Sequence, residues 1–395
     1  MRTKIIKMEK TYLNELRKFV VPEVIFGNGS IDLTARYVNN FKASKPLIVT
    51  DRGIIAAGWT TKVEESLRSS NINYAIYDNI TPNPSDEEVR EGVAFYDNQN
   101  CDMLVAVGGG SPIDCAKGIG AMYANQIDIL ELAGIDKVKH PAPPLLCIPT
   151  TSGTSADISQ FAIIKDTINK VKTALISKAM VPDVSLIDPV TTTTMSQELT
   201  AATGMDALVH AFEAYVSNAH SPITDINALK AISLIKNNLL EAVQKPKDLD
   251  IRYNMMMASF LAGLAFSNAS LGLVHAMAHS LGGQLDITHG QCNALLLEYV
   301  VEYNYNFTSE RYQDIMKALD LTLIKNRERE NKKRLTNWIK NFRNELGMGN
   351  KFTEYDFNSD LIHRLAEKAS TDPSLLTNPV QPGLKDIEEL YEKAL

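Results

Sequence analysis

The stretch Met103-Leu-Val-Ala-Val-Gly-Gly-Gly-Ser-Pro-Ile-Asp-Cys-Ala-Lys117 decides the fold of this chain. Its first five residues form an apolar run of strand length, and the residues after Pro112 have helical character. Glycines between a strand and a helix let backbone amides approach a phosphate, which the helix dipole also favours. A tight turn without a ligand needs the same glycines, so the motif alone leaves phosphate binding open.

Short apolar runs alternate with helical stretches through the first half of the chain. Further strands are predicted at residues 46–50, 73–77, 145–149 and 184–188, and helices at residues 59–69 and 85–98. This alternation is typical of a parallel sheet with helical crossovers. After about residue 190 only the helical period of 3.6 residues remains, in segments 199–216, 225–244, 251–265 and 272–281. We therefore predict an α/β domain over residues 1–190 and an all-helical domain over residues 191–395.

The size and charge of the chain limit its class. Its 395 residues exceed what one hydrophobic core usually organises, which supports two domains. A net charge of -7 argues against a nucleic-acid surface, and the basic stretch 325–334 is interrupted by acidic residues, as on a solvated helix face. The apolar segment 260–283 contains polar residues and falls short of a membrane span of about 20 residues. We expect no nucleic-acid partner and no membrane partner.

The cysteines and the N-terminus indicate a cytoplasmic location. The four cysteines are too few and too dispersed for a disulfide framework or a zinc ribbon. The first ten residues carry mixed charge and lack the apolar run of a secretory signal.

Two further loops follow predicted strands and contain groups suited to a dinucleotide. Asp51 follows the strand 46–50, where a carboxylate accepts hydrogen bonds from a ribose diol and repels a 2′-phosphate, which favours NAD over NADP. It precedes the glycine loop, whereas the ordinary Rossmann fingerprint has its acidic residue about 20 positions after the glycines. The second loop, Pro149-Thr-Thr-Ser-Gly-Thr154, offers hydroxyl and amide donors to a pyrophosphate or a ribose. Threonine-rich loops are also ordinary turns.

Three short motifs in the helical half concentrate metal-binding residue types. Asp206 and His210 are four residues apart, which places both on one face of a helix. His275 and His279 repeat this spacing, and His289 follows. Imidazoles with one carboxylate and no thiolate suit Fe(II), Zn(II), Co(II), Ni(II) or Mn(II), and the residues alone do not choose among these ions. A catalytic ion needs an open position, so one of the five residues is expected to have another role.

Together these motifs resemble those of the iron-containing (group III) alcohol dehydrogenases, over essentially the whole chain. The segments that carry the resemblance are Phe19-Val-Val-Pro-Glu-Val-Ile-Phe-Gly-Asn-Gly29, the glycine and threonine loops, Gly204-Met-Asp-Ala-Leu-Val-His-Ala-Phe-Glu213 and the block of three histidines. The resemblance implies a dehydroquinate synthase-like fold with the active site between an α/β dinucleotide domain and an all-α metal domain. It also implies NAD-dependent interconversion of a small primary alcohol or diol and its aldehyde.

The resemblance assigns roles to single residues. It places the metal ligands at Asp206, His210, His275 and His289, with Fe(II) as the expected ion. His279 matches a histidine beside the substrate that is not normally a ligand, and we expect it to relay the hydroxyl proton or to orient the ligand shell. The positions that match cofactor contacts are Asp51, Asn83, Gly109, Gly110, Ser111, Thr150, Thr151, Thr154 and Lys172. Relatives are commonly dimers or larger assemblies, so a homo-oligomer is expected.

Two segments depart from the commoner family pattern. Ser155-Ala-Asp157 stands where many members have Gly-Ser-Glu. Cys292-Asn-Ala-Leu-Leu-Leu-Glu-Tyr299 is similar to the ErcA-like branch, some of whose members are assigned regulatory roles. A regulatory homologue without turnover and a lyase of the same fold that uses a metal and NAD are therefore the alternatives to a dehydrogenase.

Overall fold

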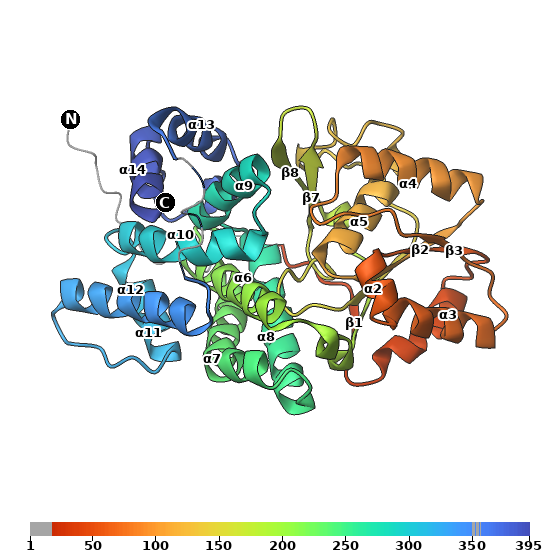
Figure 1. Cartoon of the computed structure of the whole chain (residues 1–395), viewed down its shortest axis with the longest axis horizontal. Helices are drawn as coiled ribbons and strands as arrows, with labels where there is room; N and C mark the ends of the chain where they lie inside the picture. Colours follow the sequence, from red (N-terminus) through yellow and green to blue (C-terminus); the bar gives the residue numbers. More distant parts are fainter. Residues whose placement is uncertain (1–17, 350–351, 353–354, 356) are drawn as a thin grey trace.

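The computed structural model describes residues 18–349, 352, 355 and 357–395, which form two parts that lie side by side (Figure 1). The first part is a parallel sheet flanked by helices, and the second is helical. The predicted fold class is confirmed. Residues 1–17, on which the expectation of no secretory signal rested, lie outside the described residues.

The sheet of the first part has six parallel strands. Their spatial order is β1 (Glu23–Phe26), β9 (Val184–Ile187), β6 (Leu145–Pro149), β4 (Met103–Gly108), β2 (Pro46–Val49) and β3 (Ala75–Tyr77). The four central strands are buried along their whole length, which explains their uninterrupted apolar sequences. Strand β3 begins two residues later than predicted, because only Ala75–Tyr77 pair with β2. The edge strand β1 was not predicted.

Helices cover both faces of this sheet and bury its two apolar sides. One face carries α1 (Thr34–Asn40) and α3 (Trp59–Ser69), and the other carries α4 (Asp86–Asn98) and α5 (Gly110–Asn125). Helix α4 begins at a capping box in which Ser85 and Glu88 satisfy each other's backbone N–H groups. The short helix α2 (Arg52–Ala56) begins directly after the loop that follows β2.

A hairpin that the sequence analysis missed joins the two parts. Strands β7 (Phe161–Asp166) and β8 (Val171–Ile176) pair in antiparallel fashion, and β5 (Gly134–Ile135) adds to β8. The hairpin packs against α5 of the first part and α9 of the second. Its strands contain both buried and partly exposed residues. Polar residues end the apolar run of β7 after Ile164 and interrupt β8 at Lys172 and Thr173, unlike the central strands.

The second part is all-helical in the described residues, as predicted. A 3₁₀ segment, η4 (Pro189–Thr194), leads into α6 (Gln197–Val216), α7 (Pro222–Gln244), α8 (Leu249–Ala269), α9 (Leu273–Leu285), α10 (His289–Asn304), α11 (Ser309–Ala318), α12 (Glu328–Glu345), α13 (Ser359–Ser370), η5 (Pro373–Thr377) and α14 (Leu384–Ala394). Helix α6 is buried on nearly all sides and packs against α7, α8 and α10. The helices that carry the predicted metal ligands therefore lie at the centre of this part.

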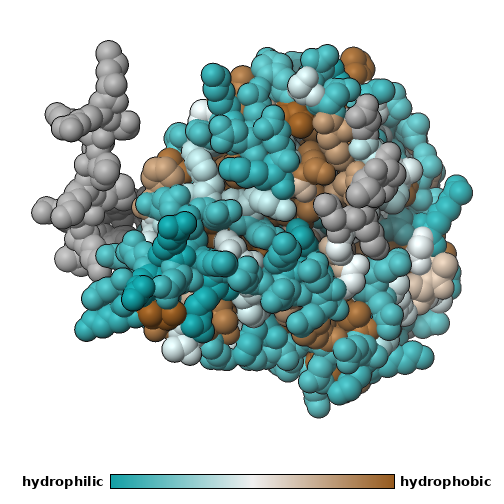
Figure 2. Space-filling model, turned by 60° about the vertical axis from the view of Figure 1, so that its left-hand side comes forward, coloured by the Kyte–Doolittle hydropathy of each residue, from teal (hydrophilic) through white to brown (hydrophobic). Residues whose placement is uncertain are grey.

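The surface is mixed in character. The face shown in Figure 2 is mainly hydrophilic with scattered hydrophobic patches. Helix α12 exposes its charged residues 328–330, as expected for a solvated face. Among the described residues no single helix meets the length and hydropathy of a membrane span, and only α8 and α9 meet them as a pair, which is bent by 101°.

Candidate active site

A cavity of about 850 Å³ lies between the sheet and the helices α6, α9 and α10. Every residue that the sequence analysis placed at the site lines it. These residues are Asp51, Asn83, Gly109, Gly110, Ser111, Thr150, Thr151, Thr154, Lys172, Asp206, His210, His275, His279 and His289. The structure thus brings the predicted cofactor positions and the predicted metal positions to one cavity.

Strand order explains how the cofactor positions meet. Strands β2, β4 and β6 are neighbours in the sheet, and Asp51, Gly109 and Thr150 follow their carboxyl ends. The chain runs from β2 to β3 on one side and then returns to place β4 on the other side of β2. Ligands of open α/β sheets bind at such a reversal of strand order. Asp51 can therefore precede the glycine loop in sequence and still lie beside it.

The glycine loop is packed too closely for other side chains. At Gly108, where φ is +153°, a Cβ atom would lie 2.6 Å from the Pro112 side chain. At Gly110 a Cβ atom would lie 3.0 Å from Thr154. The Thr150 hydroxyl lines the same space, is buried, and has no hydrogen-bond partner among the described residues. A close backbone at a helix N-terminus and an unpaired hydroxyl fit the pyrophosphate and ribose of a dinucleotide.

The loops around the glycines are tied together by hydrogen bonds. Asp51 caps helix α2, since its Oδ1 accepts a bond from the Ile54 N–H at 2.9 Å. The Asn83 N–H donates to the Ser111 hydroxyl at 3.3 Å, and Asn83 has a φ of 63°. Asp51 thus has one oxygen engaged in a structural bond and one that this bond leaves available at the cavity.

The predicted metal ligands converge from three helices. Asp206 and His210 belong to α6, His275 to α9, and His289 is the first residue of α10. The Nε2 atoms of His210, His275 and His289 lie 3.9, 3.8 and 3.6 Å from Asp206 Oδ1. Two ligand atoms about 2.1 Å from a tetrahedral ion are roughly 3.4 Å apart. The ligand atoms of Asp206, His210 and His275 all lie within 4.8 Å of one another, which fits a divalent metal ion, and His289 lies next to Asp206 as a fourth donor.

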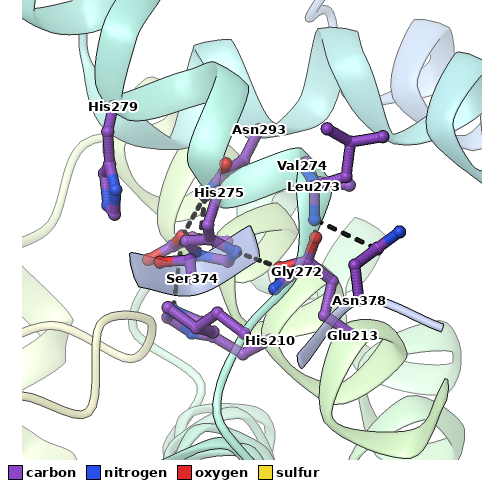
Figure 3. A network of polar contacts seen from close by, with 12 residues as sticks. His210, Glu213, Gly272, Leu273, Val274, His275, His279, Asn293, Ser374 and Asn378 are labelled. Carbon is purple, nitrogen blue, oxygen red and sulfur yellow. Dashed lines mark hydrogen bonds and ion pairs between the residues drawn. The ribbon is translucent and has the colours of Figure 1, made fainter. Parts of the chain in front are cut away.

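Glu213 contacts one of these predicted ligands. It follows His210 by one turn of α6, and its Oε2 lies 2.6 Å from His275 Nδ1 (Figure 3). Its carboxyl group also accepts bonds from the Gly272 and Val274 N–H groups. Burial raises the pKa of Glu213 to about 7, while these donors favour its charged form. A carboxylate at Nδ1 directs the Nε2 lone pair of His275 toward Asp206.

Asn293, which was not predicted from the sequence, contacts three of the predicted metal ligands. Its Nδ2 donates to Asp206 Oδ1 at 2.7 Å and lies 3.2 Å from the Nε2 atoms of both His275 and His289. Asn293 follows His289 by one turn of α10. That i, i+4 spacing was visible in the sequence, but nothing distinguished this asparagine from a structural one.

Burial keeps the histidines of the cluster neutral. It lowers the pKa of His210 to about 4 and that of His275 to about 3. The pKa of His289 is also well below its usual value, because burial, the nearby His275 ring and the positive charge of Lys172 all disfavour its protonated form. A metal ion therefore does not compete with protons for these rings near neutral pH.

Lys172 and Asp114 are two ionisable groups that line the same cavity, and Lys172 is buried while Asp114 is partly exposed. Burial lowers the pKa of Lys172 and raises that of Asp114 to about 6. Lys172 comes from β8 and lies close enough to the cluster for its charge to affect His289. Lys172 therefore lies between the residues predicted to bind the cofactor and those predicted to bind the metal.

His279 lies beside the four predicted metal ligands Asp206, His210, His275 and His289, which we call the ligand cluster. Its ring stacks on that of His289 with centroids 5.3 Å apart, and its Nδ1 lies 2.8 Å from Asp372 Oδ2. On the other side of the cluster, Phe266 stacks on His210 at 4.1 Å. Phe161 extends this aromatic wall, with its ring centroid 5.6 Å from that of Phe266. The space next to the ligands thus has one polar side and one apolar side.

Comparisons with known proteins agree with this geometry. The profile described as "Iron-containing alcohol dehydrogenase" matches residues 22–189, and the profile "Fe-containing alcohol dehydrogenase family, C-terminal" matches residues 200–395. The chain is similar to 1,3-propanediol dehydrogenase of Klebsiella pneumoniae, with 37% identity over 95% of this chain and 98% of that protein. It is also similar to alcohol dehydrogenase 4 of Schizosaccharomyces pombe, with 39% identity over 95% of this chain and 89% of that protein.

Two further similarities bear on the cofactor and the fold. The NAD-dependent methanol dehydrogenase of Bacillus methanolicus is 33% identical over 95% of this chain and 99% of its own length. A crystal structure of 1,3-propanediol oxidoreductase superposes with a TM-score of 0.92 and 36% identity, over 96% of this chain and 100% of that one.

Proposed function

The chain belongs to the iron-containing alcohol dehydrogenase family of oxidoreductases, and from this premise we propose that it is an NAD-dependent dehydrogenase of a small primary alcohol or diol. The observation that carries the proposal is the single cavity that contains both the ligand cluster and the glycine and threonine loops. The activities of two relatives, a 1,3-propanediol dehydrogenase and an NAD-dependent methanol dehydrogenase, support small alcohols as substrates and NAD as cofactor.

The proposed mechanism assigns a task to each group of residues. Asp206, His210, His275 and His289 would hold the metal ion, and the loops after β2, β4 and β6 would hold NAD. When bound, the ion supplies a Lewis acid for the substrate oxygen and NAD supplies the hydride acceptor. His279 faces the same space and would accept a hydrogen bond from the substrate hydroxyl. The aromatic wall of Phe161 and Phe266 would exclude water from the carbon chain of the substrate.

We propose Fe(II) as the ion on the strength of the family, with Zn(II), Ni(II), Co(II) and Mn(II) as candidates that the same donor set accepts. We also propose that the protein acts in the cytoplasm as a homo-oligomer, without nucleic-acid or membrane partners. The four cysteines are free and buried, which is compatible with a reducing compartment. Light scattering on the purified protein would measure the oligomeric state.

The test is metal reconstitution. We expect protein stripped of metal to form no NADH, and protein reloaded separately with Fe(II), Zn(II), Ni(II) or Mn(II) to form NADH from short alcohols and diols. His275→Ala should weaken metal binding at least roughly 10- to 100-fold and abolish turnover, because it removes a buried ligand. It should leave the affinity for NAD unchanged, since the NAD loops belong to the sheet.

The exposed histidine of α13 provides a matched control. His363 does not line the cavity, so His363→Ala should bind metal and turn over like the unmodified protein. Normal turnover by metal-free His275→Ala would contradict the site assignment. Tight binding of metal and NAD without NADH formation from any alcohol would contradict the dehydrogenase proposal and favour a regulatory protein or a lyase.

A further inference from the structure

His279 and Asp372 form a buried imidazole–carboxylate pair at the edge of the ligand cluster. His279 projects from α9 one turn after His275, as Figure 3 shows. Its Nδ1 lies 2.8 Å from Asp372 Oδ2, and the side chains are 3% and 9% exposed. Asp372 is 93 positions away along the chain, and no sequence motif linked the two residues.

Asp372 is itself held in a fixed orientation. It precedes the 3₁₀ segment η5 and caps it, because its Oδ1 accepts a bond from the Ser374 N–H at 2.8 Å. The neighbouring helices are also attached to α9. The Ser280 hydroxyl donates to the Leu365 carbonyl of α13, and the Tyr391 hydroxyl of α14 donates to the Met277 carbonyl. Of the two Asp372 oxygens, Oδ1 therefore caps η5 and Oδ2 contacts His279.

This arrangement determines which nitrogen of His279 carries the proton. A carboxylate has only acceptor atoms, so the ring atom that faces it must be a donor. Asp372 is in this charged form, because burial raises its pKa less than the electrostatic interaction with His279 and the bonds from His279 and Ser374 lower it. Nδ1 of His279 is therefore protonated, and in the neutral ring Nε2 has the free lone pair.

The pair parallels the one formed by Glu213 and His275, with a different outcome. Both carboxylates face an Nδ1 atom of α9, and both turn an Nε2 lone pair to the other side of the ring. His275 Nε2 lies 3.8 Å from Asp206, inside the ligand cluster. His279 lies one helical turn farther along, where its ring lines the cavity beside His289.

We propose that Asp372 is the positioning residue of His279, which it holds in the Nδ1–H tautomer so that Nε2 is presented to the cavity as a hydrogen-bond acceptor for the substrate hydroxyl. The tautomer part of the proposal stands on the geometry of the pair. The substrate part rests on the proposed function.

The substitution Asp372→Asn separates the two roles of Asp372. Asparagine caps helical turns as well as aspartate does, so its amide oxygen can still accept the bond from Ser374. Its NH₂ group must then face His279 Nδ1, which becomes an acceptor and moves the proton to Nε2. The fold is retained and the tautomer is inverted. An inverted tautomer is the reason that the corresponding asparagine substitution in a Ser-His-Asp triad lowers kcat.

The deciding measurement is the tautomer of His279 in the Zn(II)-loaded protein, read from long-range ¹H–¹⁵N NMR spectra of the imidazole rings. The signals of His279 are assigned by their loss in His279→Gln. We expect an Nδ1–H ring in the unmodified protein and an Nε2–H ring in Asp372→Asn. An Nε2–H ring in the unmodified protein, or the same tautomer in both proteins, would overturn the proposal whether or not the protein oxidises alcohols.

Kinetic measurements test the proposed role of His279 as a hydrogen-bond acceptor for the substrate hydroxyl. Asp372→Asn should lower kcat for alcohol oxidation roughly 10- to 100-fold while it leaves the KM for NAD and the Kd for Zn(II) within about twofold. An unchanged kcat with an inverted tautomer would overturn the role at the substrate and leave the tautomer assignment intact. If the unmodified protein itself forms no NADH, the proposed function has failed, and the NMR result still decides the positioning role.

Asp188 provides a matched control for the structural role. It also precedes a proline and caps a 3₁₀ segment, since its Oδ1 accepts a bond from the Val190 N–H at 3.0 Å. Its second oxygen accepts backbone bonds from Gly29 and Ile31 and no bond from a histidine. Asp188→Asn should reduce thermal stability and leave kcat within about twofold. An equal loss of kcat in both variants would show that Asp372 acts only on the fold.

Discussion

Two histidines of helix α9 each have a buried carboxylate at their Nδ1 atom. Glu213 and Asp372 both lie against Nδ1 atoms of helix α9, and the rings that they orient differ by one helical turn. The ring of His275 is directed into the ligand cluster and that of His279 into the adjoining space. Imidazole roles in metal sites depend on such partners, because the partner fixes the tautomer and the ring orientation.

At the residue scale, Asp51 is expected to decide between NAD and NADP. Asp51→Ser retains a cap for α2, since serine also accepts a bond from the Ile54 N–H, and it removes the negative charge at the cavity. Like charges in contact cost several kcal/mol, so the preference for NAD over NADP should fall by roughly 10- to 100-fold. The measurement is kcat/KM with each cofactor.

Because serine at position 51 still caps helix α2, a change in cofactor preference in Asp51→Ser cannot come from loss of the cap. Asp51→Ser should unfold at nearly the same temperature as the unmodified protein, whereas Asp51→Gly should lose the side-chain cap as well as the preference. An unchanged ratio of kcat/KM values in the serine variant would contradict a role of Asp51 at the ribose.

At the scale of the elements, the site depends on how closely α10 approaches α6. Gly290 follows the ligand His289, and a Cβ atom at this position would lie 2.3 Å from the carbonyl oxygen of Ala202. No side chain fits there without a shift of the helix N-terminus. The close contact of two backbones is therefore what places His289 within 3.6 Å of Asp206.

Gly290→Ala should consequently weaken metal binding. The displaced α10 would move His289 away from the other ligands, and we expect the Kd for Zn(II) to rise roughly 10- to 100-fold with unchanged NAD affinity. Titration calorimetry measures both constants. Gly349→Ala is the control, because a Cβ atom there meets nothing within 4 Å. Equal metal affinity in the two variants would show that helix approach does not position His289.

At the scale of the whole molecule, the hairpin β7–β8 couples the sheet to the helices. It packs against α5 and α9, and ion pairs and hydrogen bonds span the same junction. Lys165 of β7 pairs with Asp286 beyond α9 at 3.1 Å, and Lys368 of α13 donates to the Gln284 side chain and to carbonyl groups of the β7–β8 turn. These contacts hold the sheet and the helices together on the side of the cavity that the β7–β8 hairpin forms.

This coupling predicts one cooperative unfolding transition that both ligands raise. A ligand present at 100 times its Kd stabilises the folded state by about 2.7 kcal/mol, so Zn(II) and NAD together should stabilise it by roughly twice that amount. Scanning calorimetry with neither ligand, each alone and both together measures the effect. Two separate transitions, each shifted by only one ligand, would show that the two parts unfold independently.

The sequence by itself determined the fold class and five of the six parallel strands, and it predicted residues that line both halves of the cavity. Central strands are buried on both faces and appear as apolar runs, and ligands on one helix face recur at four-residue spacing, so each pattern is visible within one segment. The edge strand β1 was missed because none of its four residues is buried, so it does not show the apolar run of a central strand. The hairpin β7–β8 was missed because polar residues interrupt both of its strands.

Only the tertiary structure decided which residues support the ligands and how the two halves meet. Asp372 reaches His279 across 93 positions, and Asp51 reaches the glycine loop because β2 and β4 are neighbours in the sheet. Asn293 contacts Asp206 only because α10 lies against α6. Such pairings depend on the order of strands and the packing of helices, which arise from the burial of all elements together and leave no mark in the sequence near any one residue.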